Sequence, residues 1–330
     1  MNTSEQSDGF ALFGRNLFGD AIQPSPSGVI AGKFTVPPFS VLNAREGSWQ
    51  DRKRAWISLG IQSEVGRGCR PHSGGAADER PGRDATEEYT GGDAWLATNN
   101  SGTSIFDPVL CELVYRWFCP KHGMVLDPFA GGSVRGIVAG LLGYRYHGID
   151  LRPEQIAANE AQHVAIAPAA GVSYVCGDSR ERLTDAPEAD LIFTCPPYGD
   201  LEQYSDRPQD LSVMEYVDFC AAYRDILTQA IEKLKQDRFA CVVVGEFRDP
   251  KTGFYRGFVP FTQAVCVAAG AKFYNEAILV TAVGSLPIRI TKQFEAGRKL
   301  GKTHQNVLVF VKGNPRAAAD ACEGQIELPL

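Results

Sequence analysis

The sequence has no CxxC motif, and its five histidines do not lie near its nine cysteines in the spacing of zinc ligands. We therefore predict no metal site. An odd, scattered set of cysteines also argues against a disulfide framework. Several of them lie in apolar runs, where a thiol behaves as a small buried hydrophobic group. Only one or two of the nine are expected to take part in chemistry.

The sequence also lacks any apolar run near the ~18 residues that a membrane-spanning helix needs. No basic stretch followed by an apolar one opens the chain, so a secretory signal is not expected. We predict no membrane partner and a cytoplasmic location. The net charge of −6 argues against a nucleic-acid partner when the chain is taken as a whole. Its 330 residues, 44% of them hydrophobic, are enough for a full α/β core and a second module.

Four segments lack the regular pattern of the rest of the chain. Low apolar periodicity and many Gly, Pro and charged residues favour irregular structure in them. We predict a flexible arm at 1–36, a small basic Trp-bearing segment with a short strand and a possible DNA contact at 37–62, a flexible linker or loop at 63–104, and a disordered tail at 314–330.

Residues 105–313 alternate between apolar strand-like runs and amphipathic helices, which predicts an α/β domain with a mostly parallel sheet. No helix is expected between the last two strands, so the last strand is predicted to be antiparallel. Seven strands are expected, at 124–129, 144–150, 172–178, 189–198, 240–246, 273–283 and 306–313.

Three features at strand ends predict a site for a nucleoside cofactor. The first strand runs into a glycine turn, DPFAGGS at 127–133, where the backbone can approach a ligand closely. Asp150 ends the second strand, where a carboxylate can accept ribose hydroxyls. Asp178 ends the third, and it suits an adenine amine. The alternative is that DPFAGGS is only a tight turn and Asp150 only a helix cap.

DPFAGGS followed by TCPPY at 194–198 resembles the S-adenosylmethionine (SAM)-dependent DNA methyltransferases that methylate N6 of adenine or N4 of cytosine. The resemblance covers about residues 100–313, in the gamma-like motif order and in the style of stand-alone phage enzymes. It implies a Rossmann-like class I methyltransferase fold, SAM as cofactor and double-stranded DNA as partner. It also implies a set of cofactor-binding residues: Ser104, Phe106, Asp127, Phe129, Gly131, Gly132, Ser133, Asp150, Leu151, Asp178 and Ser179.

The catalytic tetrapeptide departs from that family at Cys195, because the family has Asp, Asn or Ser at this position. A thiol is a weak acceptor for an exocyclic amine. It is the nucleophile that cytosine-C5 methylation requires, because C5 becomes reactive only after a thiolate adds to C6. Cys195 after the fourth strand and Glu246 at the end of the fifth resemble, in place, the nucleophile and the Glu of cytosine-C5 methyltransferases, and this resemblance implies that Glu246 supports N3 of the base. We therefore prefer C5 methylation of cytosine, with Pro196 and Pro197 shaping the loop and Tyr198 stacking on a flipped base.

Three alternatives stay open at this point. The Cys-Pro-Pro-Tyr loop is also compatible with N4-cytosine or N6-adenine methylation, and Glu202 is a second candidate for the N3 acid. A non-catalytic SAM- or DNA-binding subunit is the rival from another class. RNA remains an alternative substrate, and the sequence does not predict an oligomeric state.

Charge is distributed unevenly along the chain. Residues 178–218 contain eleven acidic and three basic residues, whereas residues 284–312 contain six basic and one acidic. If the sixth strand is parallel to the first five, this basic segment lies at the catalytic edge, where it can neutralise phosphates. A solvated loop is the alternative. The predicted DNA-binding residues are Arg289, Lys292, Arg298, Lys299, Lys302 and His304.

Overall fold

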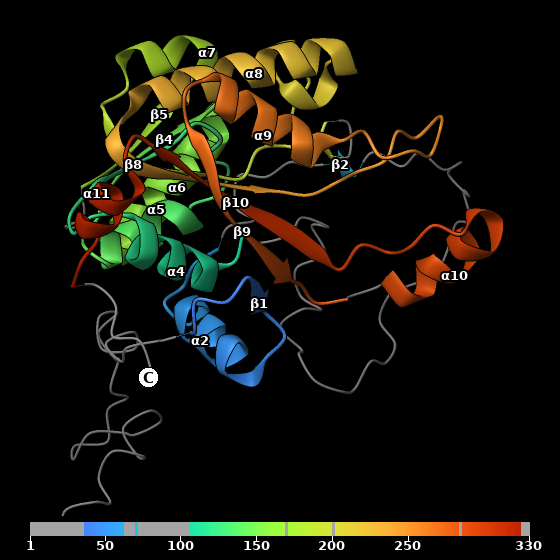
Figure 1. Cartoon of the computed structure of the whole chain (residues 1–330), viewed down its shortest axis with the longest axis horizontal. Helices are drawn as coiled ribbons and strands as arrows, with labels where there is room; N and C mark the ends of the chain where they lie inside the picture. Colours follow the sequence, from blue (N-terminus) through green and yellow to red (C-terminus); the bar gives the residue numbers. More distant parts are fainter. Residues whose placement is uncertain are drawn as a thin grey trace, which may run out of the picture.

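A single eight-stranded sheet forms the centre of the computed structural model, which describes residues 36–62, 70–71, 106–168, 171–199, 202–283 and 286–324 (Figure 1). Its strand order is β1-β9-β10-β8-β6-β3-β4-β5. The strands are β1 (Val41–Asn43), β3 (Met124–Asp127), β4 (Arg145–Asp150), β5 (Val172–Cys176), β6 (Ala189–Thr194), β8 (Leu234–Val244), β9 (Lys272–Val280) and β10 (His304–Lys312). A separate pair joins β2 (Arg70–Pro71) and β7 (Glu202–Gln203).

Neighbouring strands from β5 to β8 are parallel, whereas β10 is antiparallel to both β8 and β9. Strand β9 therefore points the same way as β8, and the carboxyl ends of all the parallel strands meet at one edge. This arrangement confirms the predicted Rossmann-like sheet with an antiparallel last strand. Strand β1 is an additional eighth strand, parallel to β9.

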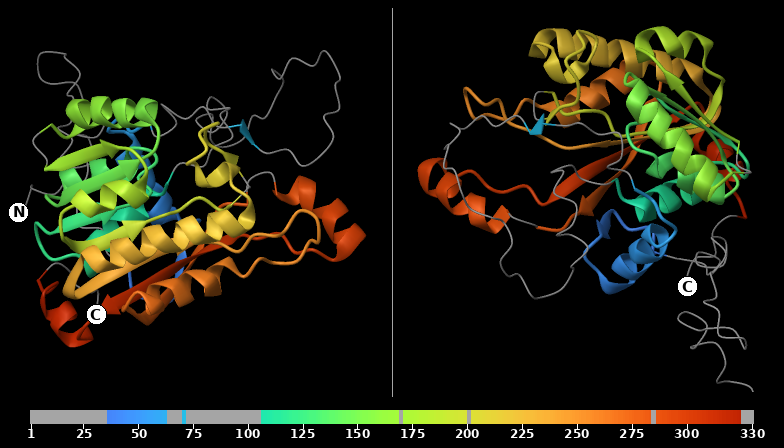
Figure 2. Two further views of the ribbon diagram at one scale, coloured as in Figure 1. Left: turned by 90° about the horizontal axis from the view of Figure 1, so that it is seen from above. Right: turned by 180° about the vertical axis from the view of Figure 1, so that it is seen from behind.

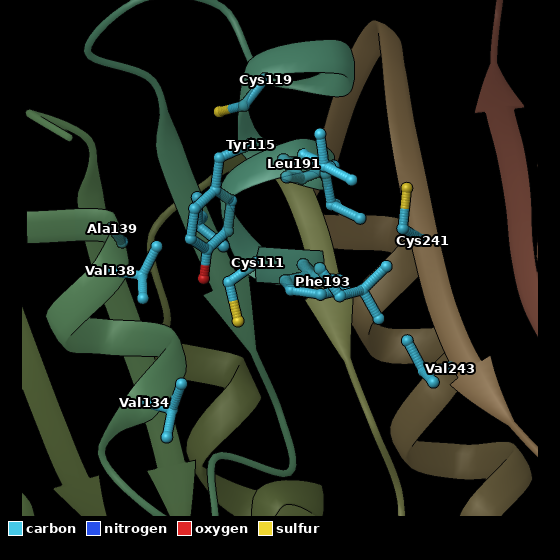
Figure 3. Packing of buried hydrophobic residues seen from close by; sticks show 14 of the residues in the cluster. Cys111, Tyr115, Cys119, Val134, Val138, Ala139, Leu191, Phe193, Cys241 and Val243 are labelled. Carbon is cyan, nitrogen blue, oxygen red and sulfur yellow. The ribbon is translucent and has the colours of Figure 1, made fainter. Parts of the chain in front are cut away.

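Helices cover both faces of the sheet (Figures 1 and 2). On one face lie α4 (Pro108–Phe118), α5 (Val134–Leu141), α6 (Pro153–Ile166) and α11 (Pro315–Asp320). On the other lie α7 (Ser179–Arg182), α8 (Tyr216–Lys233) and α9 (Phe258–Ala268), with the 3-10 turns η1 (Leu183–Asp185) and η2 (Leu211–Val213) nearby. Figure 3 shows Tyr115 and Cys111 of α4 packing between α5 and strands β6 and β8.

The start of α4 shows how local sequence sets an element that borders the site. The Asp107 carboxylate accepts the N–H groups of Val109 at 2.9 Å and Leu110 at 3.4 Å, and Pro108 occupies the first helical position. The helix ends before Pro120, which cannot continue it. The same cap tethers α2 (Gly47–Ile57), because Trp49 Nε1 donates to Asp107 at 3.2 Å.

The 37–62 segment packs against the rest of the fold through β1 and α2, and its predicted contact with DNA stays a prediction. Trp49 and Trp56 are buried in this packing. The basic residues of α2 form ion pairs within the protein: Arg52 with the buried Glu112 at 2.8 Å, Lys53 with Asp107 at 3.2 Å, and Arg54 with Asp51. Little of the segment's positive charge is left for phosphates.

Two predictions are wrong. Helix α10 (Leu286–Gly297) lies between β9 and β10, where no helix was expected; most of its described side chains are exposed. Residues 315–320 of the predicted disordered tail form α11, which Asn314 caps and which buries Ala318. Residues 1–35, most of 63–104 and 325–330 lie outside the described residues, so the predicted arm and linker stay predictions. In the described part, no helix combines the length and apolarity that crossing a bilayer requires.

Candidate active site

A cavity of about 650 Å³ opens at the carboxyl edge of the sheet. Cavities of roughly 300–1,000 Å³ hold small-molecule ligands and cofactors. The wall comes from the turn after β3, the ends of β4, β5, β6, β8 and β9, the start of β10, and helix α2. The cavity therefore spans the two regions that the sequence analysis assigned to cofactor and to chemistry.

The first half of the cavity is built around Gly131. This residue has φ +51°, a left-handed conformation that glycine adopts without a steric penalty. Its N–H donates to Asp150 Oδ2 at 3.0 Å, and its carbonyl accepts from Asn159 Nδ2 at 2.7 Å. Asp150 Oδ1 accepts the N–H of Arg152 at 2.9 Å. The glycine turn is thus fixed to the end of β4, with the Asp150 carboxylate in the cavity wall.

The predicted residues at the end of β5 line the same half. Asp178 accepts the backbone N–H of Arg180 and pairs with its guanidinium at 2.6 Å. The sequence analysis did not anticipate this partner. Ser179 Oγ donates to the carbonyl of Pro128 at 2.6 Å and so ties α7 to the turn after β3. The apolar lining that was predicted here is present as well, from Phe106, Phe129 and Leu151.

Three predicted cofactor residues lie behind the wall rather than in it: Asp127, Gly132 and Ser133. Asp127 is fully buried, and its carboxylate accepts from Phe129 N, Thr194 Oγ1, Tyr146 Oη and Arg135 Nε, at 2.5 to 3.1 Å. Ser133 Oγ donates to Gln162 at 3.1 Å. These residues hold the turn in place, which corrects their assignment as cofactor contacts. Ser104 lies outside the described residues.

The catalytic tetrapeptide follows β6, and its four residues line the middle of the cavity. Cys195 is half-buried, with Sγ 3.9 Å from Tyr198 Oη. The Tyr198 hydroxyl also accepts from Gln305 Nε2 at 2.8 Å, and burial together with Cys195 raises the pKa of this phenol. Its ring meets Phe258 edge-on at 6.1 Å. The Tyr198 ring is therefore fixed in position beside the Cys195 thiol.

Arg135 is a buried cation close to Cys195 that the sequence analysis missed. Burial alone lowers its pKa, but nearby negative groups, Asp127 first and Cys195 among them, raise it above the ordinary value. A neighbouring cation favours the thiolate form of a cysteine. Only its position eight residues after Asp127 hints at the pairing, because the two lie at opposite ends of the glycine turn.

Glu246 lines the cavity as predicted, but its carboxylate has a different task. Oε1 accepts the N–H of Val259 at 2.7 Å, and Oε2 accepts that of Gly257 at 3.1 Å. Both oxygens thus hold the start of α9, where N–H groups lack partners within the helix. The prediction that Glu246 supports N3 as an acid does not fit this arrangement. The side chain of Glu202, the other candidate, lies outside the described residues.

The basic segment reaches the catalytic edge, as predicted from a parallel sixth strand. Lys302 and His304 line the cavity, whereas Lys292 and Arg298 are exposed on and beside α10. Lys299 Nζ lies 2.8 Å from the position that a Cβ on Gly253 would take, so the 298–302 stretch meets the chain after β8. The side chain of Arg289 lies outside the described residues.

Among the described residues, no three His, Cys, Asp or Glu side chains converge to form a metal site. The cavity also has lining residues that no motif marks, notably Gln50 and Lys53 of α2, and Gln305 of β10. Their contribution follows from the tertiary fold, which brings α2 and β10 to the edge of the central strands.

No protein-family model matches this chain, and no curated protein matches it in sequence. Solved structures with a similar chain path include TrmN from Thermus thermophilus (17% identity, TM-score 0.43, 63% of this chain and 49% of TrmN). A TehB-like SAM-dependent methyltransferase from Corynebacterium glutamicum matches at 17% identity and a TM-score of 0.39, over 66% of this chain and 94% of that one. Magnesium protoporphyrin IX methyltransferase from Synechocystis, solved with bound SAH, matches at 8% identity and a TM-score of 0.41, over 63% of this chain and 81% of that one.

Proposed function

We propose that this chain is a SAM-dependent methyltransferase that methylates C5 of cytosine in double-stranded DNA. One observation carries the proposal: a single cavity joins a glycine turn and two strand-end carboxylates to a half-buried thiol on a Pro-Pro-Tyr loop. A nucleoside cofactor and a base that share this space would bring a methyl donor and its acceptor together.

The first half of the cavity fits a nucleoside with an attached amino acid. The Asp150 carboxylate accepts two backbone N–H groups, pairs with the Arg152 guanidinium at 3.5 Å, and borders the cavity where ribose hydroxyls would lie. Phe106, Phe129 and Leu151 supply apolar surface for a purine and an alkyl chain. SAM, when bound here, supplies a methyl group on a positively charged sulfur.

The second half fits the activation of cytosine. The Cys195 thiolate would add to C6 of the ring, forming an S–C bond and making C5 nucleophilic toward the methyl group. C5 would then take the methyl group as the bond between that group and the SAM sulfur breaks, and S-adenosylhomocysteine would leave. A water molecule acting as base would remove the C5 proton, so that the S–C bond at C6 breaks, the Cys195 thiolate leaves and the C5–C6 double bond is restored. Arg135 beside Cys195 supports the thiolate, and Tyr198 lines the space that a flipped base would occupy.

Two projections flank the cavity and support a nucleic-acid partner. Helix α10 and the 247–257 chain extend from the same end of the sheet (Figures 1 and 2). Lys292, Arg298 and Lys299 lie on or near the first, and Arg248 and Lys251 lie on the second. Phe254 at the tip of the second is 75% exposed. Basic side chains can bind the phosphates of a duplex, and an exposed aromatic ring can occupy the gap that a flipped base leaves in the stack.

The experiment that tests this function is covalent trapping on a duplex containing 5-fluorocytosine, incubated with SAM. Fluorine at C5 cannot leave as a proton, so a C5 enzyme stays attached to the base after methyl transfer. We expect a stable protein–DNA adduct for the wild type and none for Cys195→Ser. Buried Cys266→Ser is the matched control and should form the adduct. Absence of a wild-type adduct, with SAM bound, would contradict C5 chemistry.

A further inference from the structure

We propose that the Lys302 ammonium donates a hydrogen bond to N3 of the target cytosine and stabilises the charge that thiolate addition places on the ring. This inference rests on the proposed function and names the group that replaces Glu246 in it. Lys302 was predicted from the sequence as a phosphate contact. Its place in the cavity points to a contact with the base.

The reaction needs a donor at this position. When the Cys195 thiolate adds to C6, its electron pair enters the ring and negative charge accumulates on N3 and O2. A preorganised donor aimed at that charge lowers the barrier. Glu246 does not serve, because both of its oxygens accept N–H groups from the start of α9. An ammonium group carries only donors, so it meets the requirement directly.

Lys302 lies in the same part of the cavity as the catalytic loop. A Cβ placed on Gly245 would lie 3.8 Å from Lys302 Nζ and 3.7 Å from Tyr198 Cε2, so both groups border one point of the wall. The lysine is half-buried, whereas Lys292 and Arg298 are exposed. A phosphate-binding side chain would be expected among the exposed ones, at the rim.

The backbone beside Lys302 is held by the sheet rather than by a free loop. The carbonyl of Thr303 accepts the N–H of Thr281 at 2.9 Å, directly after β9. The next residue, His304, opens β10 and pairs with Val280. Two residues on, Asn306 pairs with Val244 at the end of β8. Lys302 is thereby positioned beside Gly245 and Glu246.

The charges around Lys302 affect its titration in opposite directions. Burial lowers the pKa of Lys302, and Glu246 at the end of β8 partly offsets this. His304 on β10 also faces the lysine, and Tyr198 borders it from the loop after β6. The lowered pKa means that the ammonium is lost at a lower pH than for an ordinary lysine, whose pKa is about 10.4. Turnover should therefore fall on the alkaline side as Lys302 loses its proton.

The same contact would select the base. N3 of cytosine accepts a hydrogen bond, whereas N3 of thymine carries a hydrogen and would face the ammonium as a second donor. A buried donor left opposite another donor costs binding energy. Lys302 would thus favour cytosine over thymine in the pocket.

The test measures the rate of adduct formation on 5-fluorocytosine DNA for wild type, Lys302→Met, Lys302→Gln and the control Lys272→Met. We expect Lys302→Met to lower the maximal rate by about 10²–10⁴-fold with little change in the DNA concentration for half-maximal rate. Lys302→Gln, which keeps a neutral donor, should retain part of the rate and lose the alkaline decline. Exposed Lys272, at the opposite end of β9, should behave as wild type.

Two outcomes would overturn the role of Lys302 and leave the proposed function intact. One is an unchanged maximal rate in Lys302→Met with weaker DNA binding and a salt slope reduced by about 1, which marks a phosphate contact. The other is an unchanged alkaline decline in Lys302→Gln. If the wild type forms no adduct, the proposed function itself fails. SAM binding by each variant shows that it is folded.

Discussion

Asp127 serves the site at the residue scale without touching its cavity. Its carboxylate joins the glycine turn, through Phe129 N, to the last residue of β6, through Thr194 Oγ1 at 2.6 Å. Because Thr194 directly precedes Cys195, this one side chain sets the spacing between the cofactor turn and the catalytic loop. Its charge is balanced by Arg135, which is itself buried.

We predict that Asp127→Asn destabilises the protein by about 3–5 kcal/mol, because it leaves the Arg135 guanidinium buried without a counter-charge. Urea unfolding followed by circular dichroism measures the change. Asp51→Asn removes the acid of an exposed ion pair, and it should stay within about 0.5 kcal/mol of wild type. Equal stability of the two variants would show that Asp127 does not have this role.

At the residue scale, the motifs of the sequence identified several residues that the fold brings to one cavity. Gly131, Asp150, Asp178 and Cys195 were predicted, and they line the cavity. The role of Asp127 was not predicted correctly. Whether its side chain faces the cavity or the core depends on the packing around β3, which the motif does not show. Lys302 was predicted from its charge to bind DNA, but its position in the cavity wall follows from the pairing of β10 with its neighbours.

At the scale of elements, the 247–257 chain forms a braced projection beside the cavity. Arg248 pairs with Tyr255 in an isolated bridge, and its guanidinium lies 3.9 Å from the centre of that ring. Asp249 accepts the N–H groups of Lys251 and Thr252 at 2.9 and 2.8 Å. A projection fixed in this way has no packing reason to expose Phe254 at its tip, so the exposed ring favours a contact with a partner.

We predict that Phe254→Ala slows adduct formation on duplex DNA by about 10–100-fold, because a wedge that replaces the flipped base is worth a few kcal/mol at most. On single-stranded DNA, where no base needs replacing, the loss should be much smaller. Val164→Ala, an exposed apolar residue on α6, is the control and should change neither rate. An equal loss on both substrates would contradict the wedge.

The sequence predicted strand β1 but not helix α10. A short strand was expected within 37–62, and β1 forms there at Val41–Asn43, where it pairs with β9. Most of the described side chains of helix α10 are exposed, so burial in the core gives little signal for it in the sequence. The central strands were predictable because burial on both faces leaves a continuous apolar run such as ACVVV.

At the scale of the whole molecule, the fold decides which charged residues border the cavity. The acidic excess of residues 178–218 is spread from α7 through β6 to the start of α8, whereas Lys302 and His304 of the basic segment line the cavity. The net charge of −6 therefore says little about the partner. Instead, strand order decides which charges meet a substrate, since β9 and β8 end at the same edge.

Mass spectrometry of nucleosides shows directly which atom of the base receives the methyl group. Duplex DNA is incubated with the protein and isotopically labelled SAM, digested to nucleosides and analysed, with Cys195→Ser in parallel. We expect labelled 5-methylcytosine for the wild type and none for the variant. Label in N4-methylcytosine or N6-methyladenine, or methylation retained by Cys195→Ser, would contradict it.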